Sequence, residues 1–481
     1  MPLKKFARWA SLLLIVAALG ACAKPAPHAD IRMAVAQAPI NLDPRYATDA
    51  ASERVNRLIY QPLVDFDEHA RPIAALASWQ ILDATHYRFH LRQPGTRFHD
   101  GTPLIATDVV ATYQSLLALH DSPHTAEFAN IIEVKAQDAA TVDFALRVPD
   151  ANFPARLIIG IMPAELIKNG HDFAHEPIGN GPLKFLLWQG TLKLQRVADG
   201  QLISLQEVKD PTVRVLKLLR GEADLLQGDL PPELVTYLQR QPKIILQTST
   251  GANFSYIGFN FRDPLLAKTK VRQAIAHAID RQAIIAHALV AGSREAGAIL
   301  PPEHWAGNPG LQPYGYDPAL SRKLLQQSGI QLPLKLVYKT STDAQRVRLA
   351  TILQAQMKPA GIELEIRSLD WGTFFDDIKH GKFQLYGLTW VGIKTPEIYR
   401  LAFHSDAVPP KGANRGYFQD VGLDKLIESE NWLGATQRIH QQLPYIPLWY
   451  EGQFVAMRKG LGNYALKPDG NWTGLATIIR K

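Results

Sequence analysis

Residues 343–366, DAQRVRLATILQAQMKPAGIELEI, decide the fold class, because a helical segment is followed there directly by a strand. The pattern from Asp343 to Lys358 favours a helix, and Pro359 with Gly361 ends it. From Ile362 to Ile366 apolar and acidic residues alternate, which is typical of a strand with one buried face. A helix that leads straight into a strand predicts an α/β unit.

The same succession continues on both sides of this stretch. Helices are predicted around an apolar stripe at Val271–Ile279, from Asp317 to Gly329 and at Trp371–Lys379, and a strand at Phe383–Thr389. Nearer the N-terminus, strands are predicted at Ile31–Val35, Tyr87–Arg92 and Thr141–Leu146, with a helix at Ala51–Leu58. The residue pattern therefore predicts α/β lobes with mixed sheets.

Length and charge narrow the class of protein. The chain has 481 residues, far more than one core of about 100–200 residues uses, so we expect at least two lobes. The formal net charge is +7, from 52 Lys and Arg against 45 Asp and Glu. Spread over this length, a net charge of +7 does not indicate nucleic-acid binding, and we expect no nucleic-acid partner.

The N-terminus predicts export. Three cations, Lys4, Lys5 and Arg8, precede an apolar stretch that ends in Leu19-Gly20-Ala21-Cys22, which is the pattern of a cleaved signal peptide over residues 1–21. Cys22 is the only cysteine, so a disulfide scaffold is excluded. The four residues that end at Cys22 resemble the lipobox of bacterial lipoproteins, which implies a lipid on its thiol. The alternative is a plain signal peptide with an incidental cysteine, and the membrane leaflet stays open.

Several motifs occur together along the chain. They are Leu76-Ala77-Ser78-Trp79, Phe98-His99-Asp100-Gly101-Thr102-Pro103-Leu104, Gly179-Asn180-Gly181-Pro182, Leu219–Asp224, Val271–Ala276, Tyr316-Asp317-Pro318 and Pro444–Leu448. In this order they resemble the peptide/nickel-type solute-binding proteins of ABC importers, over essentially the whole mature chain. We interpret the segment from Phe98 to Leu104 as a turn held by side-chain capping and assign it no chemistry.

The resemblance implies a two-lobed clamp of the type II-like binding-protein fold with an extra subdomain. It divides the chain into a signal peptide (1–21), a tether (22–30), lobe I (31–48, 170–255 and 444–481), a subdomain (49–169) and lobe II (256–443). Chain crossings near residues 255 and 443 form the hinge in this division. The implied protein is a periplasmic, lipid-anchored monomer that captures a peptide-like ligand and delivers it to permease and ATPase subunits.

The resemblance also marks candidate ligand-binding residues. In peptide-binding members a lobe II strand ends in Trp, and an Asp three residues later holds the peptide ammonium. Here the strand ends at Trp390, but Ile393 occupies the Asp position. A buried ammonium without a counter-charge is costly. Either Glu397 or another acid takes this role, or the ligand is not a peptide with a free N-terminus.

Other residues near this strand are candidates as well. Trp390 is expected to face the cleft, with packing inside the lobe as the alternative, and Thr389 and Gly392 to offer hydrogen bonds. Lys394 is expected to favour a carboxylate or another anion, and the alternative is a solvated loop charge. The further candidates are Tyr256 and Asn260 beside the hinge and Tyr46 after the Asp43-Pro44 turn. For each of these three, a structural role is the competing interpretation.

Three alternatives remain beside the transport interpretation. A nickel or metal-chelate site could use one of two H-x3-H spacings, at His120–His124 and His171–His175, but both lie in polar, loop-like sequence. An enzyme is not expected, because the sequence has no H-E-x-x-H, G-x-S-x-G or P-loop motif. The third is a ligand-sensing lipoprotein without transport. We predict no cofactor and no metal ligand.

Overall fold

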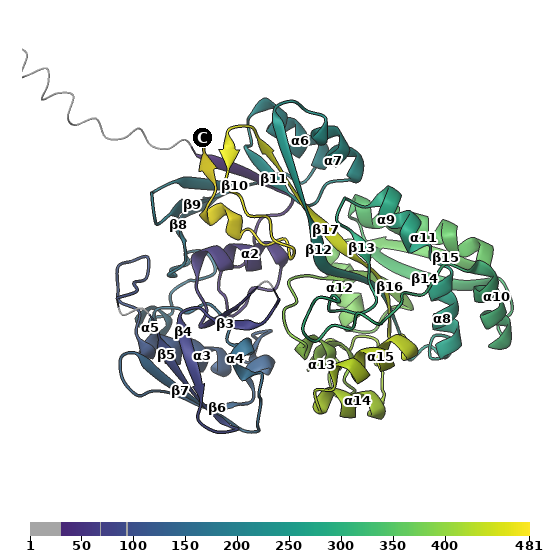
Figure 1. Cartoon of the computed structure of the whole chain (residues 1–481), viewed down its shortest axis with the longest axis horizontal. Coiled ribbons are helices and arrows are strands. Elements are labelled where there is room, and N and C mark those ends of the chain that lie inside the picture. The colour runs from purple at the N-terminus through teal and green to yellow at the C-terminus, as the bar shows by residue number, and fades with distance from the viewer. Residues whose placement is uncertain (1–29, 68, 93–94) are drawn as a thin grey trace, which may run out of the picture.

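The computed structural model describes residues 30–67, 69–92 and 95–481 (Figure 1). The predicted signal peptide and the lipidation site at Cys22 lie outside these residues. Within the described ranges, every helix is too short or too polar to cross a bilayer. The chain forms two α/β lobes and a smaller α+β subdomain (Figure 1).

One large mixed sheet runs through both lobes. Its strands, in spatial order, are β15 (Ile362–Leu369), β14 (Leu334–Ser341), β16 (Leu385–Trp390), β12 (Ile244–Phe259), β17 (Tyr445–Arg458), β11 (Leu225–Gln227), β1 (Ile31–Val35), β10 (Leu202–Glu207), β9 (Thr191–Arg196) and β8 (Leu183–Gln189), with β13 (Arg294–Glu295) paired to β17. Strand β14 is parallel to β15 and β16, whereas β12 is antiparallel to β16 and β17. The predicted α/β class with mixed sheets is confirmed.

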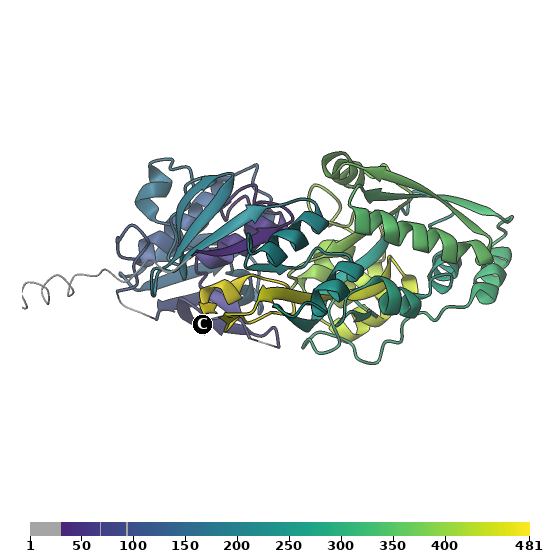
Figure 2. The ribbon, with the colours of Figure 1, turned by 90° about the horizontal axis from the view of Figure 1, so that it is seen from above.

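Strands β12 and β17 connect the lobes. They pair from Ile244 with Arg458 to Gly258 with Tyr445, and two register shifts interrupt the ladder. Gly251 lies in the first shift, where a Cβ atom would sit 1.5 Å from the carbonyl oxygen of Glu451. Figure 2 shows β17, in yellow, running between the two ends of the molecule. This two-stranded ribbon is the physical link between the lobes.

Lobe I has helices on both faces of its part of the sheet. Helices α6 (Pro211–Arg220) and α7 (Pro232–Gln239) pack on one face, and α2 (Ala50–Ile59) packs on the other. Strand β1 alternates accordingly, because Ile31 and Met33 belong to the core under α2 while Ala34 belongs to the core under α6. The C-terminal part adds β18 (Leu461–Gly462), η3 (Thr473–Ala476) and β19 (Ile479–Arg480).

Lobe II is also covered on both faces. One face carries α8 (Thr269–His277), α9 (Arg281–Ala288), α10 (Pro318–Gln327), α11 (Ala344–Met357) and the short η2 (Lys358–Ala360). The other face carries α12 (Trp371–Lys379), α13 (Glu397–Phe403), α14 (Val421–Glu428) and α15 (Trp432–Gln442). Asp343 and Asp317 cap α11 and α10 through their carboxylates, as expected for the residue before a helix.

The subdomain is built on a separate four-stranded antiparallel sheet. Its strands are β4 (Ala77–Ile81), β5 (His86–Leu91), β7 (Thr141–Leu146) and β6 (Ile131–Ala136). Helix α3 (Ala106–Ala118) packs on this sheet, and the remaining elements are β2 (Val64–Phe66), β3 (Pro72–Ala74), η1 (Thr125–Phe128), α4 (Phe153–Arg156) and α5 (Ala164–Lys168).

Two of the sequence motifs meet at the end of α2. The predicted turn is confirmed, because the Asp100 carboxylate accepts from the Thr102 amide at 2.9 Å and Gly101 has a φ of 91°. The His99 amide then donates to the Gly179 carbonyl at 2.8 Å. The Gly181 amide donates in turn to the carbonyl of Ile59, the last residue of α2. The motifs therefore fix the helix that reaches into the cavity described next.

Candidate ligand-binding cleft

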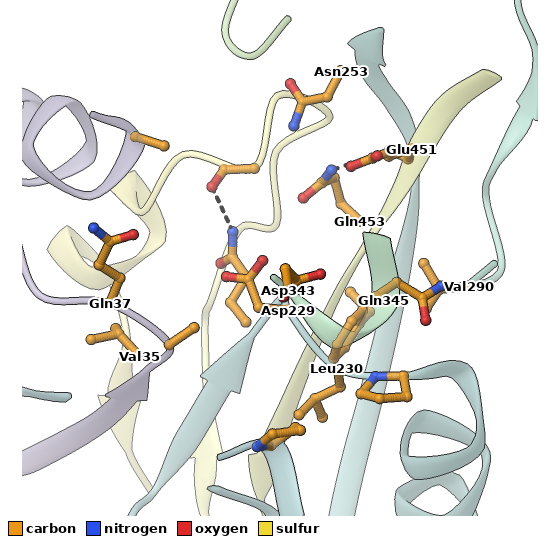
Figure 3. Close-up of a pocket in the computed structure, with 18 of the residues that line it drawn as sticks. Val35, Gln37, Asp229, Leu230, Asn253, Val290, Asp343, Gln345, Glu451 and Gln453 are labelled. Carbon is orange, nitrogen blue, oxygen red and sulfur yellow. Dashed lines mark hydrogen bonds between the residues drawn. The ribbon is translucent and has the colours of Figure 1, made fainter. Parts of the chain in front are cut away.

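A cavity of about 640 Å³ lies where the two lobes and α2 meet. It is lined from lobe I by the end of β1, the segments 209–214 and 227–232 and the C-terminal loop at residues 470–472. Lobe II contributes residues 289–293, 342–349 and Val391, and the β12–β17 ribbon contributes Asn253 and residues 451–454. Figure 3 shows the labelled lining residues converging from these elements.

A carboxylate from the ribbon lies in the cavity wall. Glu451 of β17 is paired with Arg346 of α11 at 2.7 Å, and the same oxygen accepts from Ser255 at 2.6 Å and Thr389 at 3.1 Å. Burial alone would raise the pKa of Glu451, but the Arg346 guanidinium outweighs it and holds the pKa below its usual range. Glu451 is therefore an anion whose charge is matched within the chain.

The two neighbouring candidates Thr389 and Trp390 point to opposite faces of β16. Thr389 faces Glu451, whereas Trp390 packs in the core between the sheet and α12–α15. The indole of Trp390 stacks on Tyr256 with ring centroids 6.4 Å apart, and the Arg415 guanidinium lies 4.9 Å from the indole. Neither Thr389 nor Trp390 is among the residues that line the cavity, and a ligand role for both stays a prediction.

The three other candidates are held by contacts within the protein. Tyr256 is 1% exposed, stacks on Tyr445 and accepts a hydrogen bond from Arg415 at 3.3 Å. The side-chain amide of Asn260 donates to the backbone carbonyls of Phe383 and Gly381. Tyr46 donates its hydroxyl proton to Asp121 in the subdomain at 3.0 Å. A ligand role for these residues stays a prediction.

The loop after β16 carries the remaining predicted residues. The Gly392 amide donates to the Asn253 side chain, a cavity residue, at 3.3 Å. Ile393 packs against the core under α12–α15. Glu397, one candidate for the absent carboxylate, is paired with Arg156 of the subdomain at 2.9 Å.

Lys394 in this loop has a partner in lobe I. Its ammonium lies 2.6 Å from the carboxylate of Asp469, which is 7% exposed. A ligand anion at Lys394 would therefore compete with Asp469, and the predicted anion-binding role stays a prediction.

The Lys394–Asp469 pair predicts acid sensitivity. Burial alone would raise the pKa of Asp469, but Lys394 lowers it from 3.8 to about 2. The pKa is lower in the folded state, so the stabilisation is present above about pH 4 and is lost as pH falls towards 2. We expect urea unfolding to show Asp469→Asn less stable than wild type by about 2 kcal/mol at pH 7. This difference should shrink between pH 4 and pH 2, and a constant difference would contradict the assignment.

The histidine pairs do not form a metal centre in the described part of the chain. His124 lies near the Ala47 carbonyl and Glu127, and His175 pairs with Asp172. His171 contacts the carbonyl of Glu176. In residues 30–67, 69–92 and 95–481, no three His, Cys, Asp or Glu side chains are placed to share an ion.

The sequence interpretation missed several residues of the cavity and its rim. They are Arg54, Arg346, Glu451, Asp469 and Trp472. Glu451 had a usable signal, because it is the single acid in a long apolar segment that became β17. The others had none, since each stands in an ordinary helix or turn and is brought to the cleft only by the packing of distant segments.

Comparison with known proteins identifies the family. The model for "Bacterial extracellular solute-binding proteins, family 5 Middle" matches residues 70–407. Di/tripeptide-binding protein 1 of Pseudomonas aeruginosa is 26% identical over 521 aligned positions, covering 95% of each chain. The dipeptide-binding protein of Escherichia coli is 25% identical, covering 86% of this chain and 87% of that protein.

Solved structures share the fold over the same extent. The oligopeptide-binding protein AppA of Bacillus subtilis, in complex with a nonapeptide, superposes with a TM-score of 0.83 at 22% identity, covering 95% of this chain and all of that one. This likeness confirms the two-lobed clamp with its extra subdomain. The match to the family model extends over more than half of the sequence. The chain therefore belongs to the bacterial extracellular solute-binding proteins of family 5.

Proposed function

We propose that this chain is the extracytoplasmic binding component of an ABC importer and captures a peptide or peptide-like ligand. The observation that carries the proposal is the cavity of about 640 Å³, whose wall is shared between both lobes and the ribbon that joins them. Its volume lies within the range of small-molecule sites. The relatives named as di/tripeptide-binding and dipeptide-binding proteins support a peptide as the ligand class. No covalent step is part of this function.

The ligand acts by favouring the closed clamp. A binding protein changes its open–closed equilibrium only through a difference in affinity between the two forms. Three ion pairs bridge the parts of the clamp: Lys394 with Asp469, Arg348 with Glu233, and Arg156 with Glu397. The first two join lobe II to lobe I, and the third joins it to the subdomain. A ligand in the cavity would add its own contacts to both sides.

The proposal includes the location and assembly expected from the sequence. A signal peptide over residues 1–21 exports the chain, and a lipid on Cys22 tethers it to the membrane through residues 22–30. The body works as a periplasmic monomer whose lobe I comprises 31–48, 170–255 and 444–481, with the subdomain at 49–169 and lobe II at 256–443. Its partners are the permease and ATPase subunits of the importer.

A thermal-shift panel tests the ligand class. The purified protein is mixed with di- to octapeptides, N-acetylated peptides, glutathione, and nickel with and without histidine. A ligand at 100 times its Kd adds about 2.7 kcal/mol, so we expect the melting temperature to rise by a few degrees with at least one peptide. If only nickel with histidine stabilises the protein, the peptide proposal is wrong. If nothing does, the transport function loses its support.

A further inference from the structure

One cation in the cavity wall has no anionic partner among the described residues. Arg54 of α2 lines the cavity, and its guanidinium carbon lies 5.4 Å from the ring centroid of Trp472. Its Nε atom is buried and has no hydrogen-bond partner in the described structure. Over residues 30–67, 69–92 and 95–481, no carboxylate comes within 4.0 Å of this side chain. An arginine side chain stays charged in proteins, so Arg54 brings to the cavity a positive charge that no carboxylate contacts. The carboxylates of Asp229 and Asp343 also belong to the lining, but neither is paired with Arg54.

The other two arginines of the cavity are satisfied within the protein. Arg346 is paired with Glu451 at 2.7 Å. Arg214 donates to the carbonyls of Val208 and Lys209, and to that of Asp229. A guanidinium has five N–H donors, and unmet donors in a partly buried site cost free energy. Of these three arginines, only Arg54 has N–H donors that remain available to a ligand.

The neighbours of Arg54 orient it without neutralising it. Trp472 is 3% exposed, so it offers the guanidinium a fixed aromatic surface. The adjacent Gly470 has a φ of 71° and no side chain, and a Cβ there would lie 3.5 Å from an Nη atom of Arg54. The Gly470 carbonyl already accepts a hydrogen bond from the side-chain amide of Gln227 at 2.9 Å. The remaining basic residue of the wall, Lys209, is exposed to solvent, which screens its charge.

We propose that Arg54 binds a carboxylate of the ligand, with Trp472 holding the plane of its guanidinium. This inference rests on the proposed function, and it narrows the ligand to peptides or peptide-like molecules that carry a free carboxylate. The planar fork of an arginine matches the two oxygens of a carboxylate, which a lysine ammonium does not. Helix α2 places Arg54 in the cavity because its C-terminal end is fixed by the contacts of Gly181 with Ile59.

Calorimetric titration with trialanine and with its C-terminal amide tests the proposal. Amidation removes the ligand carboxylate and leaves the rest of the peptide intact. For the wild type we expect amidation to weaken binding by about 10- to 100-fold, the range for a hydrogen-bonded charged pair. For Arg54→Gln we expect the two ligands to bind within about twofold of each other. Arg54→Lys keeps the charge and should keep part of the preference.

Arg57→Gln is the matched control. Arg57 lies one turn further along α2, outside the cavity lining, and its guanidinium is 3.9 Å from Asp65. This variant should discriminate between the two ligands as the wild type does. The melting temperature of each unligated variant reports whether it is folded. If Arg54→Gln does not fold, the comparison of Arg54→Lys with the wild type decides.

The outcomes separate the two proposals. If the wild type binds trialanine and its amide equally well, or if Arg54→Gln still prefers the free acid, the role of Arg54 is wrong while peptide binding stands. If the wild type binds neither form, the tripeptide assignment fails and the inference about Arg54 falls with it. A preference for the free acid that disappears only in Arg54→Gln supports both.

Discussion

The Trp449→Ala variant is expected to lose about 3–5 kcal/mol of its free energy of unfolding, the usual cost of removing a large aromatic side chain from a core. Trp449 lies in β17, is 1% exposed and packs in the core between the lobe II sheet and α8–α11. It also pairs with Ser255 of β12 and Glu295 of β13. Its removal leaves a cavity where three strands meet, and urea unfolding followed by far-UV circular dichroism measures the loss.

Trp371→Ala is the control for this variant. Trp371 begins α12, is 55% exposed and stacks on Phe375 with ring centroids 5.4 Å apart. Its truncation should cost about 1 kcal/mol or less, because most of its surface is already in water. Equal losses for the two tryptophans would mean that the core around β17 is not packed as described.

The Gly251→Ala variant is expected to destabilise the protein by about 3 kcal/mol, the upper part of the range for overpacking. The added Cβ would lie 1.5 Å from the Glu451 carbonyl oxygen, and backbone atoms of a paired strand cannot move aside as a side chain can. The two strands of the ribbon must therefore separate at the link between the lobes. We expect a lower urea midpoint and also weaker binding of any peptide that the panel identifies.

Gly315→Ala provides the matched substitution. Nothing lies within 4 Å of a Cβ built on Gly315, and its φ is not in the left-handed region. This variant should be as stable as the wild type, or slightly more stable, since alanine restricts the unfolded chain. If Gly251→Ala behaves in the same way, the ribbon is more adaptable than the described packing allows.

Helices and strands could be predicted well where the signal is local. The helix predicted at Trp371–Lys379 is found with those bounds, because Asp370 caps it and Gly381 follows it. The strand predicted at Phe383–Thr389 is found at Leu385–Trp390. Capping, glycine and alternation act over a few residues, so a single sequence carries them. Strand order is different, because no local signal says that β17 pairs with both β12 and β11.

The candidate site was predictable only in part. Thr389 faces a cavity residue, whereas its neighbour Trp390 cannot share that direction, since consecutive residues of a strand point to opposite faces. A single residue of alternation therefore decides which of the two side chains contacts Glu451. The charges that shape the cavity depend on packing between distant segments, as in the pairing of Lys394 with Asp469. Such pairs cannot be predicted from the order of residues in the chain.

The place of β17 in the sheet bears on how the chain is synthesised. It is the last long strand in the sequence, yet it lies between β12 and β11 in the middle of the large sheet. Nascent domains generally fold as units once their residues are available, at translation rates of about 5–20 residues per second. Neither lobe can close its sheet before Arg458 emerges from the ribosome. In a chain exported as proposed, the large sheet of both lobes would thus stay incomplete until late in translation, because the strand that completes it arrives last.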